Sequence, residues 1–126
     1  MTDQTTIQNA INWFEIPVSD LDRAVKFYES VFEVSLHRDT MDVIELAVFP
    51  FQEGTVSGAL IKCDFLQPSA TGSLVYFNVN NKLDQTLVLA KENNAEIFLP
   101  KTDIGKNGII AHIGDTEGNK IALHSF

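Results

Sequence analysis

The chain has 126 residues, of which 44% are hydrophobic, and a formal net charge of -8 at pH 7. This length is typical of one globular domain, and no apolar run approaches the roughly 20 residues that cross a bilayer, so a membrane-spanning segment is excluded. The acidic balance argues against nucleic acid as a partner, because phosphate groups need a basic patch and the nine Lys and Arg residues are scattered.

The first ten residues are polar and lack the basic and apolar segments of a secretory leader. They predict a polar N-terminal tail over residues 1–10 and a cytoplasmic protein. Apolar and polar residues then alternate over residues 11–18, which is typical of a strand. Apolar residues recur at i, i+3, i+4 and i+7 over residues 21–32, which predicts an amphipathic helix capped by Ser19 or Asp20.

Short strands are predicted after this helix. Their ranges are 34–38, 41–49 and 58–63, with turns at Asp39-Thr40 and over residues 50–57. The first half of the chain therefore has the order β-α-β-β-β. Residues 67–72, which contain a proline, a serine and a glycine, have the composition of a join between two halves.

The second half repeats this order roughly 60 residues later, as expected for a duplicated supersecondary unit. The predicted elements are a strand over residues 73–79, a helix over 83–93, and strands over 95–99, 108–114 and 119–125. Neither half can bury its sheet alone. The sequence therefore predicts an α+β fold with a single domain over residues 11–126. Two β-α-β-β-β modules, about residues 11–66 and 73–126, are expected to form an incomplete curved barrel around a shared cleft.

Two motifs carry a family resemblance. Residues 15–28 read EIPVSDLDRAVKFY, and residues 115–123 read DTEGNKIAL. Together they resemble the vicinal oxygen chelate superfamily, the group of glyoxalases, bleomycin-resistance proteins and extradiol dioxygenases. The resemblance covers residues 11–126. It implies the paired β-α-β-β-β fold, a ligand cleft that holds a divalent metal in the enzymes, and a homodimer.

The metal ligands implied by this resemblance come from the first and last strands of each half. The corresponding positions here hold Trp13, Leu74 and Ala122, with Leu60 or Lys62 at the fourth. None of these side chains is a suitable ligand for a hard divalent cation. We therefore expect no metal at the usual position and no other cofactor, and a metal only if the ligands have shifted.

Polar side chains lie two residues further along the same predicted strands. They are Glu15, Tyr76 and His124, and strand alternation directs all three into one cavity. Glu15 and His124 are expected to form a hydrogen-bonded pair capable of acid–base chemistry. Trp13 adds an aromatic wall for a cation or a ring, and Glu45 is expected to face the cleft from the opposite wall. These five residues are the predicted ligand site.

The leading hypothesis is a metal-independent protein of uncharacterised specificity that binds a small molecule in this cleft. The resemblance to bleomycin-resistance proteins makes sequestration of a cationic or aromatic compound its concrete form. One alternative is a lyase, isomerase or dioxygenase with a metal on Glu15 and His124, which would need a third ligand from Glu45, Tyr76 or a partner chain. Another is a metal-free enzyme in which Glu15 and His124 are catalytic. A homodimer is expected because the open edges of the two sheets can be covered by a second copy of the chain.

Overall fold

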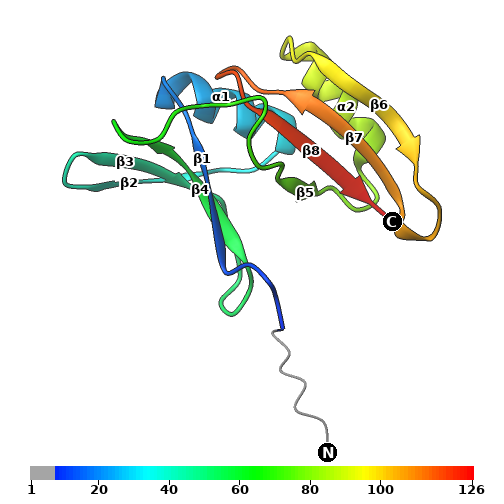
Figure 1. Cartoon of the computed structure of the whole chain (residues 1–126), viewed down its shortest axis with the longest axis horizontal. Helices are drawn as coiled ribbons and strands as arrows, with labels where there is room; N and C mark the ends of the chain where they lie inside the picture. Colours follow the sequence, from blue (N-terminus) through cyan, green and yellow to red (C-terminus); the bar gives the residue numbers. More distant parts are fainter. Residues whose placement is uncertain (1–7) are drawn as a thin grey trace, which may run out of the picture.

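The computed structural model describes residues 8–126 and contains the β-α-β-β-β order twice (Figure 1). The first module comprises β1 (Trp13–Pro17), α1 (Leu21–Phe32), β2 (His37–Met41), β3 (Ile44–Val48) and β4 (Ser57–Lys62). The second comprises β5 (Tyr76–Asn78), α2 (Leu83–Glu92), β6 (Ile97–Asp103), the 3-10 turn η1 (Gly105–Asn107), β7 (Ile109–Gly114) and β8 (Lys120–Ser125). Residues 1–7 of the predicted tail lie outside the described residues. Neither described helix has the length and apolar content needed to cross a membrane.

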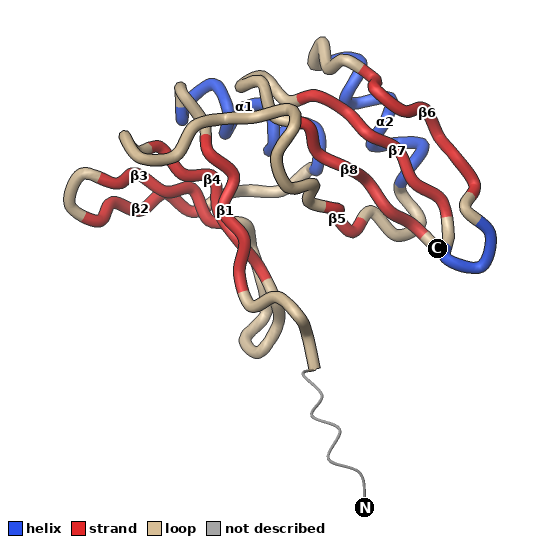
Figure 2. The backbone as a smooth tube through the Cα atoms, in the orientation of Figure 1, coloured by secondary structure: helices blue, strands red, loops and turns tan. Residues whose placement is uncertain are grey.

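Each module forms one mixed four-stranded sheet. The strand orders are β1-β4-β3-β2 and β5-β8-β7-β6. β1 runs parallel to β4 and β5 parallel to β8, and the remaining pairs are antiparallel. Figure 2 shows the two groups of strands as separate open sheets. The predicted α+β fold with two modules is confirmed, and the two sheets do not close into a barrel.

Helix α1 follows from its cap and its apolar face. The Asp20 side chain accepts a hydrogen bond from the Arg23 backbone N–H at 3.0 Å, which satisfies one of the free donors of the first turn. Leu21, Val25 and the other apolar residues at helical spacing are buried, as predicted. The helix ends where Glu33 adopts a left-handed conformation with φ of 56°.

Aromatic side chains from both modules pack together between the sheets. The rings of Phe14, Tyr28, Phe32, Phe49 and Phe77 are neighbours, with centroid separations from 4.6 Å for Phe32–Phe77 to 6.0 Å for Tyr28–Phe77. Each such pair contributes about 0.5–1.5 kcal/mol beyond its buried area. This aromatic cluster joins the two modules through apolar contact.

The first hairpin differs from its predicted position. The turn lies at Asp42-Val43, where Met41 pairs with Ile44, and Asp39-Thr40 belongs to β2. Asp42 has a φ of 57°, a left-handed conformation that an aspartate tolerates better than most residues because its side chain bonds to nearby backbone.

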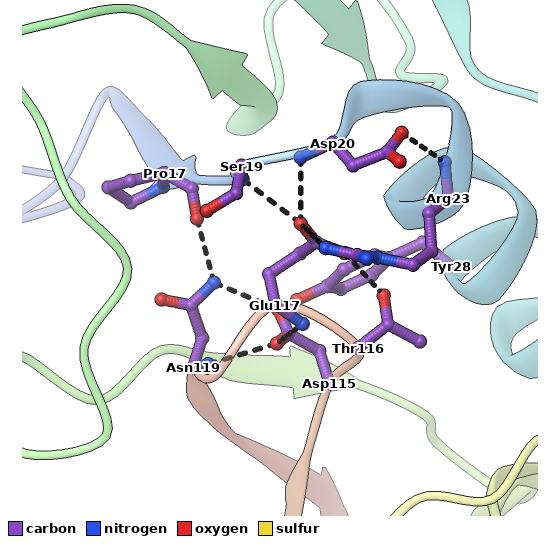
Figure 3. A network of polar contacts seen from close by, with 9 residues as sticks. All are labelled: Pro17, Ser19, Asp20, Arg23, Tyr28, Asp115, Thr116, Glu117 and Asn119. Atoms are coloured by element: carbon purple, nitrogen blue, oxygen red, sulfur yellow. Dashed lines mark hydrogen bonds and ion pairs between the residues drawn. The ribbon is translucent and has the colours of Figure 1, made fainter.

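A buried carboxylate, Glu117, fixes the turn between β7 and β8 to the start of α1 (Figure 3). It accepts hydrogen bonds from the backbone N–H groups of Ser19 and Asp20 at 3.0 and 2.9 Å, and from Arg23 Nε at 2.7 Å. Burial alone would raise the pKa of Glu117. The hydrogen bonds from Arg23, from the two backbone donors and from Thr116 outweigh burial and lower this pKa from 4.5 to about 2.

Asp115 and Asn119 complete the same joint. The Tyr28 hydroxyl donates to Asp115 at 2.7 Å, and Asn119 Nδ2 donates to the Pro17 carbonyl at 2.8 Å. Asn119 also accepts from the Ser69 backbone N–H at 2.9 Å, so it reaches the segment between the modules. Burial, and then Asp115, raise the pKa of Tyr28 well above its ordinary value. We call these residues, with Ser19, Asp20, Arg23 and Glu117, the Glu117 joint.

We predict that Glu117→Gln lowers the free energy of unfolding at pH 7 by about 3 kcal/mol. The reason is that Arg23 and the backbone N–H groups of Ser19 and Asp20 lose the negative charge to which they donate. The lowered pKa of Glu117 means that its contribution is complete above pH 4.5 and is lost as the pH falls toward 2. Urea unfolding measured from pH 7 to pH 2 should therefore show a steeper loss of stability in the wild type than in Glu117→Gln. Glu53→Gln, at an exposed position of the equivalent turn in the first module, is the matched control. Parallel pH profiles for the wild type and Glu117→Gln would contradict this assignment.

Candidate functional site

A groove of about 890 Å³ lies between the two modules, where β1 and β5 are the end strands of their sheets. Its walls are mainly apolar and include Phe14, Phe49 and Phe77 of the aromatic cluster. The polar groups on its walls include Glu15 and Tyr76. Its other charged residues are Glu33 and Lys82. A cavity of this size with a mainly apolar lining is typical of small-molecule sites.

The groove arises because the two modules are joined at only one of two equivalent places. In the second module, the Glu117-Gly118 turn binds the backbone of Ser19 and Asp20, directly before α1. The matching Glu53-Gly54 turn of the first module projects away from α2 beside the start of β1, and Glu53 is exposed (Figure 1). The N-cap residue of α2, Lys82, makes no side-chain capping hydrogen bond. The space that a second joint would fill is therefore left as the groove.

Two of the five predicted site residues, Glu15 and Tyr76, line this groove. Trp13 lies beside Glu15, and its Nε1–H donates to Glu15 Oε2 at 3.3 Å. The Trp13 ring is 41% exposed and meets the Phe51 ring edge-on, with centroids 6.4 Å apart. Trp13 and Glu15 therefore form one polar and aromatic edge beside the groove.

The predicted Glu15–His124 pair does not form within the described residues. His124 Nε2 donates instead to the Asn107 carbonyl at 2.7 Å, and Glu15 accepts from Trp13. Alternation correctly puts Glu15 on the face of β1 opposite the core, but β1 and β8 belong to different sheets that do not close on each other. Acid–base chemistry by these two residues stays a prediction.

Glu45 lies on the opposite face of its sheet from Glu15. In the register of β3 with β4, Glu45 pairs with Lys62 and shares its face with Ala47 of the main core, whereas Glu15 pairs with Ala59. Glu45 lines a surface pocket at the start of α1. The expectation that Glu45 faces the cleft is thus corrected, because a shift of one residue in the strand register moves a side chain to the other face of the sheet.

A hydrogen-bonded pair that sequence reasoning did not select lies on the second sheet. The Tyr76 hydroxyl and His112 Nε2 are 3.2 Å apart. Both residues lie opposite Ala122 in the sheet, Tyr76 on β5 and His112 on β7. Burial, and then the charge of Lys120, lower the pKa of His112 from its ordinary value. The signal in the sequence was alternation in β7, which gives the face of His112 but not its distance from Tyr76.

The family model described as Glyoxalase/Bleomycin resistance protein/Dioxygenase superfamily matches residues 10–123. The chain belongs to this superfamily. Among curated proteins, none matches the sequence.

Solved structures share the superfamily's fold with this chain. A glyoxylase/bleomycin resistance protein/dioxygenase domain from Frankia sp. EAN1pec has 17% identity and a TM-score of 0.74, with 94% of this chain and 98% of that chain covered. The fosfomycin resistance protein FosX from Listeria monocytogenes has 15% identity and a TM-score of 0.69, with 94% and 91% covered. TnmS3, an antibiotic binding protein from Streptomyces sp. CB03234, has 20% identity and a TM-score of 0.65, with 97% and 98% covered. At these identities the likeness concerns the fold alone.

The metal positions implied by the superfamily are held here by side chains that do not fit a divalent cation. Trp13, Leu74 and Ala122 supply no carboxylate, imidazole or thiolate. Within residues 8–126, no three His, Cys, Asp or Glu side chains gather in a way that would hold a metal.

We predict that protein purified without a histidine tag contains less than about one metal ion per ten chains, because catalytic sites need about three protein ligands. The measurement is metal analysis by mass spectrometry, before and after incubation with zinc, nickel, manganese and iron. Near-stoichiometric metal that disappears in Glu15→Gln or His124→Ala would instead establish a site on shifted ligands.

Proposed function

We propose that this protein binds a small, largely aromatic molecule in the groove between its modules, without a metal. The observation that carries the proposal is the groove itself, whose mainly apolar wall comes from both modules and carries two carboxylates, Glu15 and Glu33, against one lysine, Lys82. Burial of apolar ligand surface supplies affinity at about 25 cal/mol per Å² before the costs of binding are subtracted.

The Glu15 carboxylate favours a ligand with a cationic group. Among the described residues, the Glu15 carboxylate has no cation within ion-pair distance, and the one side chain that donates a hydrogen bond to it is Trp13. The neighbouring Trp13 ring offers a face to the same cation. The net charge of -8 also raises the local concentration of cations around the chain.

Sequestration of a toxic compound is the form of binding that we favour. FosX is named as a fosfomycin resistance protein and TnmS3 as an antibiotic binding protein, which supports this choice for a chain of the same fold. The absence of a fitting metal position supports binding over the metal-dependent lyase, isomerase and dioxygenase alternatives.

We predict that tetraphenylphosphonium, an aromatic cation, binds saturably and changes the fluorescence of Trp13, the one tryptophan in the chain. Tetraphenylborate has the same shape and the opposite charge, so it should bind more weakly. Glu15→Gln should weaken cation binding about two- to fivefold, as expected for a partly exposed charge pair, and narrow the difference between the two probes.

Glu53→Gln removes the same charge from a turn residue that does not line the groove and is the control for this comparison. Equal affinities of the two probes, or equal losses in both variants, would argue against a ligand cation at Glu15. Absence of saturable binding by either probe would argue against the groove as a site for aromatic ligands.

We further propose a homodimer. β2 and β6 are the outer strands of their sheets, and every residue of β2 is exposed. Met41 and Val43, at the tip of the β2–β3 hairpin, are 58% and 77% exposed. Open strand edges and exposed apolar side chains support association between copies.

Light scattering on the eluting peak of a sizing column should give the mass of two chains. Val43→Lys should shift this mass toward one chain, because a charge would be buried at the hairpin tip. Val88→Lys, on the exposed face of α2, should leave the mass unchanged. A single-chain mass for the wild type at all concentrations would exclude the dimer.

A further inference from the structure

The chain contains one Asn-Gly pair, Asn107-Gly108, in the loop between β6 and β7. In such a pair the backbone nitrogen of the glycine can attack the side-chain amide of the asparagine, because the glycine has no side chain to shield its nitrogen. Asn107 is exposed, and the turn η1 that contains it buries none of its residues. Figure 2 shows η1 beside the C-terminal end of β8. The asparagine side chain is therefore open to water.

The packing of this loop requires glycine at position 108. Gly108 has a φ of 107°, which residues with side chains rarely adopt. An added Cβ would also lie 2.4 Å from the Ser125 carbonyl oxygen. The nucleophilic half of the Asn-Gly pair is thus fixed by the close approach of the loop to β8.

An imidazole is bonded to the peptide group that joins the pair. His124 Nε2 lies 2.7 Å from the backbone carbonyl oxygen of Asn107. A carbonyl oxygen only accepts, so Nε2 carries a proton and donates it. The Phe126 ring meets the His124 ring edge to face, with centroids 4.8 Å apart, and holds the imidazole in this position.

This contact lies where negative charge would develop. Loss of the Gly108 N–H proton leaves a charge that amide resonance shares between the nitrogen and the Asn107 carbonyl oxygen. An N–H group already held at hydrogen-bond distance from that oxygen stabilises the anion as it forms. The His124 contact therefore favours the nucleophilic form of the Gly108 nitrogen.

We propose that Asn107 is a site of self-modification, at which His124 promotes loss of the side-chain amide. Hydroxide removes the Gly108 N–H proton, and the nitrogen forms a bond to Asn107 Cγ. The bond from Cγ to Nδ2 breaks, and Nδ2 takes protons from water and leaves as ammonia. A second water then opens the five-membered imide at either carbonyl group, which gives aspartate or isoaspartate. No oxidant or reductant takes part.

The loop must open before the Gly108 nitrogen can attack. Its N–H donates to the Gly105 carbonyl at 3.0 Å, and the Ile104 N–H donates to the Gly108 carbonyl at 2.9 Å. The hydrogen bonds of short 3-10 turns have poor geometry, and exposed turns open at low cost in free energy. In a trans peptide the N–H and the carbonyl point in opposite directions. The Gly108 N–H can therefore leave Gly105 while His124 stays on the Asn107 carbonyl.

The product changes the loop between β6 and β7. Either acid adds a negative charge to a chain whose formal charge is already -8. Isoaspartate also adds a carbon to the backbone before Gly108, which displaces this glycine from its place against the Ser125 carbonyl. The loop therefore loosens as the protein ages. This modification is independent of ligand binding in the groove.

The experiment ages the full chain at pH 8 and follows the peptide that contains residue 107 by mass spectrometry. Exchange of the amide for an acid raises the mass of this peptide by about 1 Da. Conversion should be first order in time and should exceed that of Asn94, an exposed asparagine that precedes alanine. Asn107→Gln keeps an amide but needs a larger ring for the attack, so it should show no conversion.

Variants of His124 test its role. His124→Phe removes the donor and should slow conversion about fivefold, as expected for the loss of one hydrogen bond. His124→Gln keeps an N–H donor and should retain most of the wild-type rate. His37→Phe changes an exposed histidine of β2 and is the matched control, with an unchanged rate.

A purely structural role for His124 predicts the opposite sign, because a loop that has lost this contact opens more easily and reacts faster. The proposal is overturned if His124→Phe converts as fast as the wild type or faster. It is also overturned if Asn107 converts no faster than Asn94 in the wild type, a result that does not depend on the folding of any variant.

Discussion

The arrangement of the two modules depends on one buried carboxylate. Glu117 lies in the second module, and its side chain has no exposed surface. A buried charge is tolerated only where hydrogen-bond donors surround it. Three donors to Glu117 come from the first module: the backbone N–H groups of Ser19 and Asp20, and Arg23 Nε. A rotation of one module against the other would break these three contacts and leave Thr116 as the donor from its own module. The joint therefore sets the angle between the sheets.

The site follows from the absence of a second such joint. Each module has a Glu-Gly turn between its last two strands, but only the second module's turn meets the helix of the other module. On the open side, the end strands β1 and β5 stay apart above the aromatic cluster, and the groove forms between them. The two modules are thus related by an approximate symmetry, but one of the two turn–helix contacts is missing. The cavity on that side has an apolar wall and a polar edge.

Local periodicity predicted the elements well, because the helical and strand patterns depend on short-range burial. The long helix α1, its capping aspartate and the repeated strand order all follow from such patterns. Contacts between strands that are distant in the sequence were harder to predict. Alternation gives the face on which Glu15 and His124 lie, but not whether their two sheets close on each other. The face on which Glu45 lies depends on the strand register, and a shift of one residue reverses it. The Tyr76–His112 contact depends on Ala122 lying between them, which only strand pairing reveals.

The separation of the joint along the chain has a consequence for folding. Glu117 is 94 residues from Arg23 and 98 from Ser19. During synthesis, the first module therefore leaves the ribosome long before the carboxylate that binds the start of its helix is made. Contacts of such long range are costly in loop entropy and form late. The N-terminal half should therefore become stably folded only after the β7–β8 hairpin has formed. The two halves then fold as one cooperative unit, although the chain is internally duplicated.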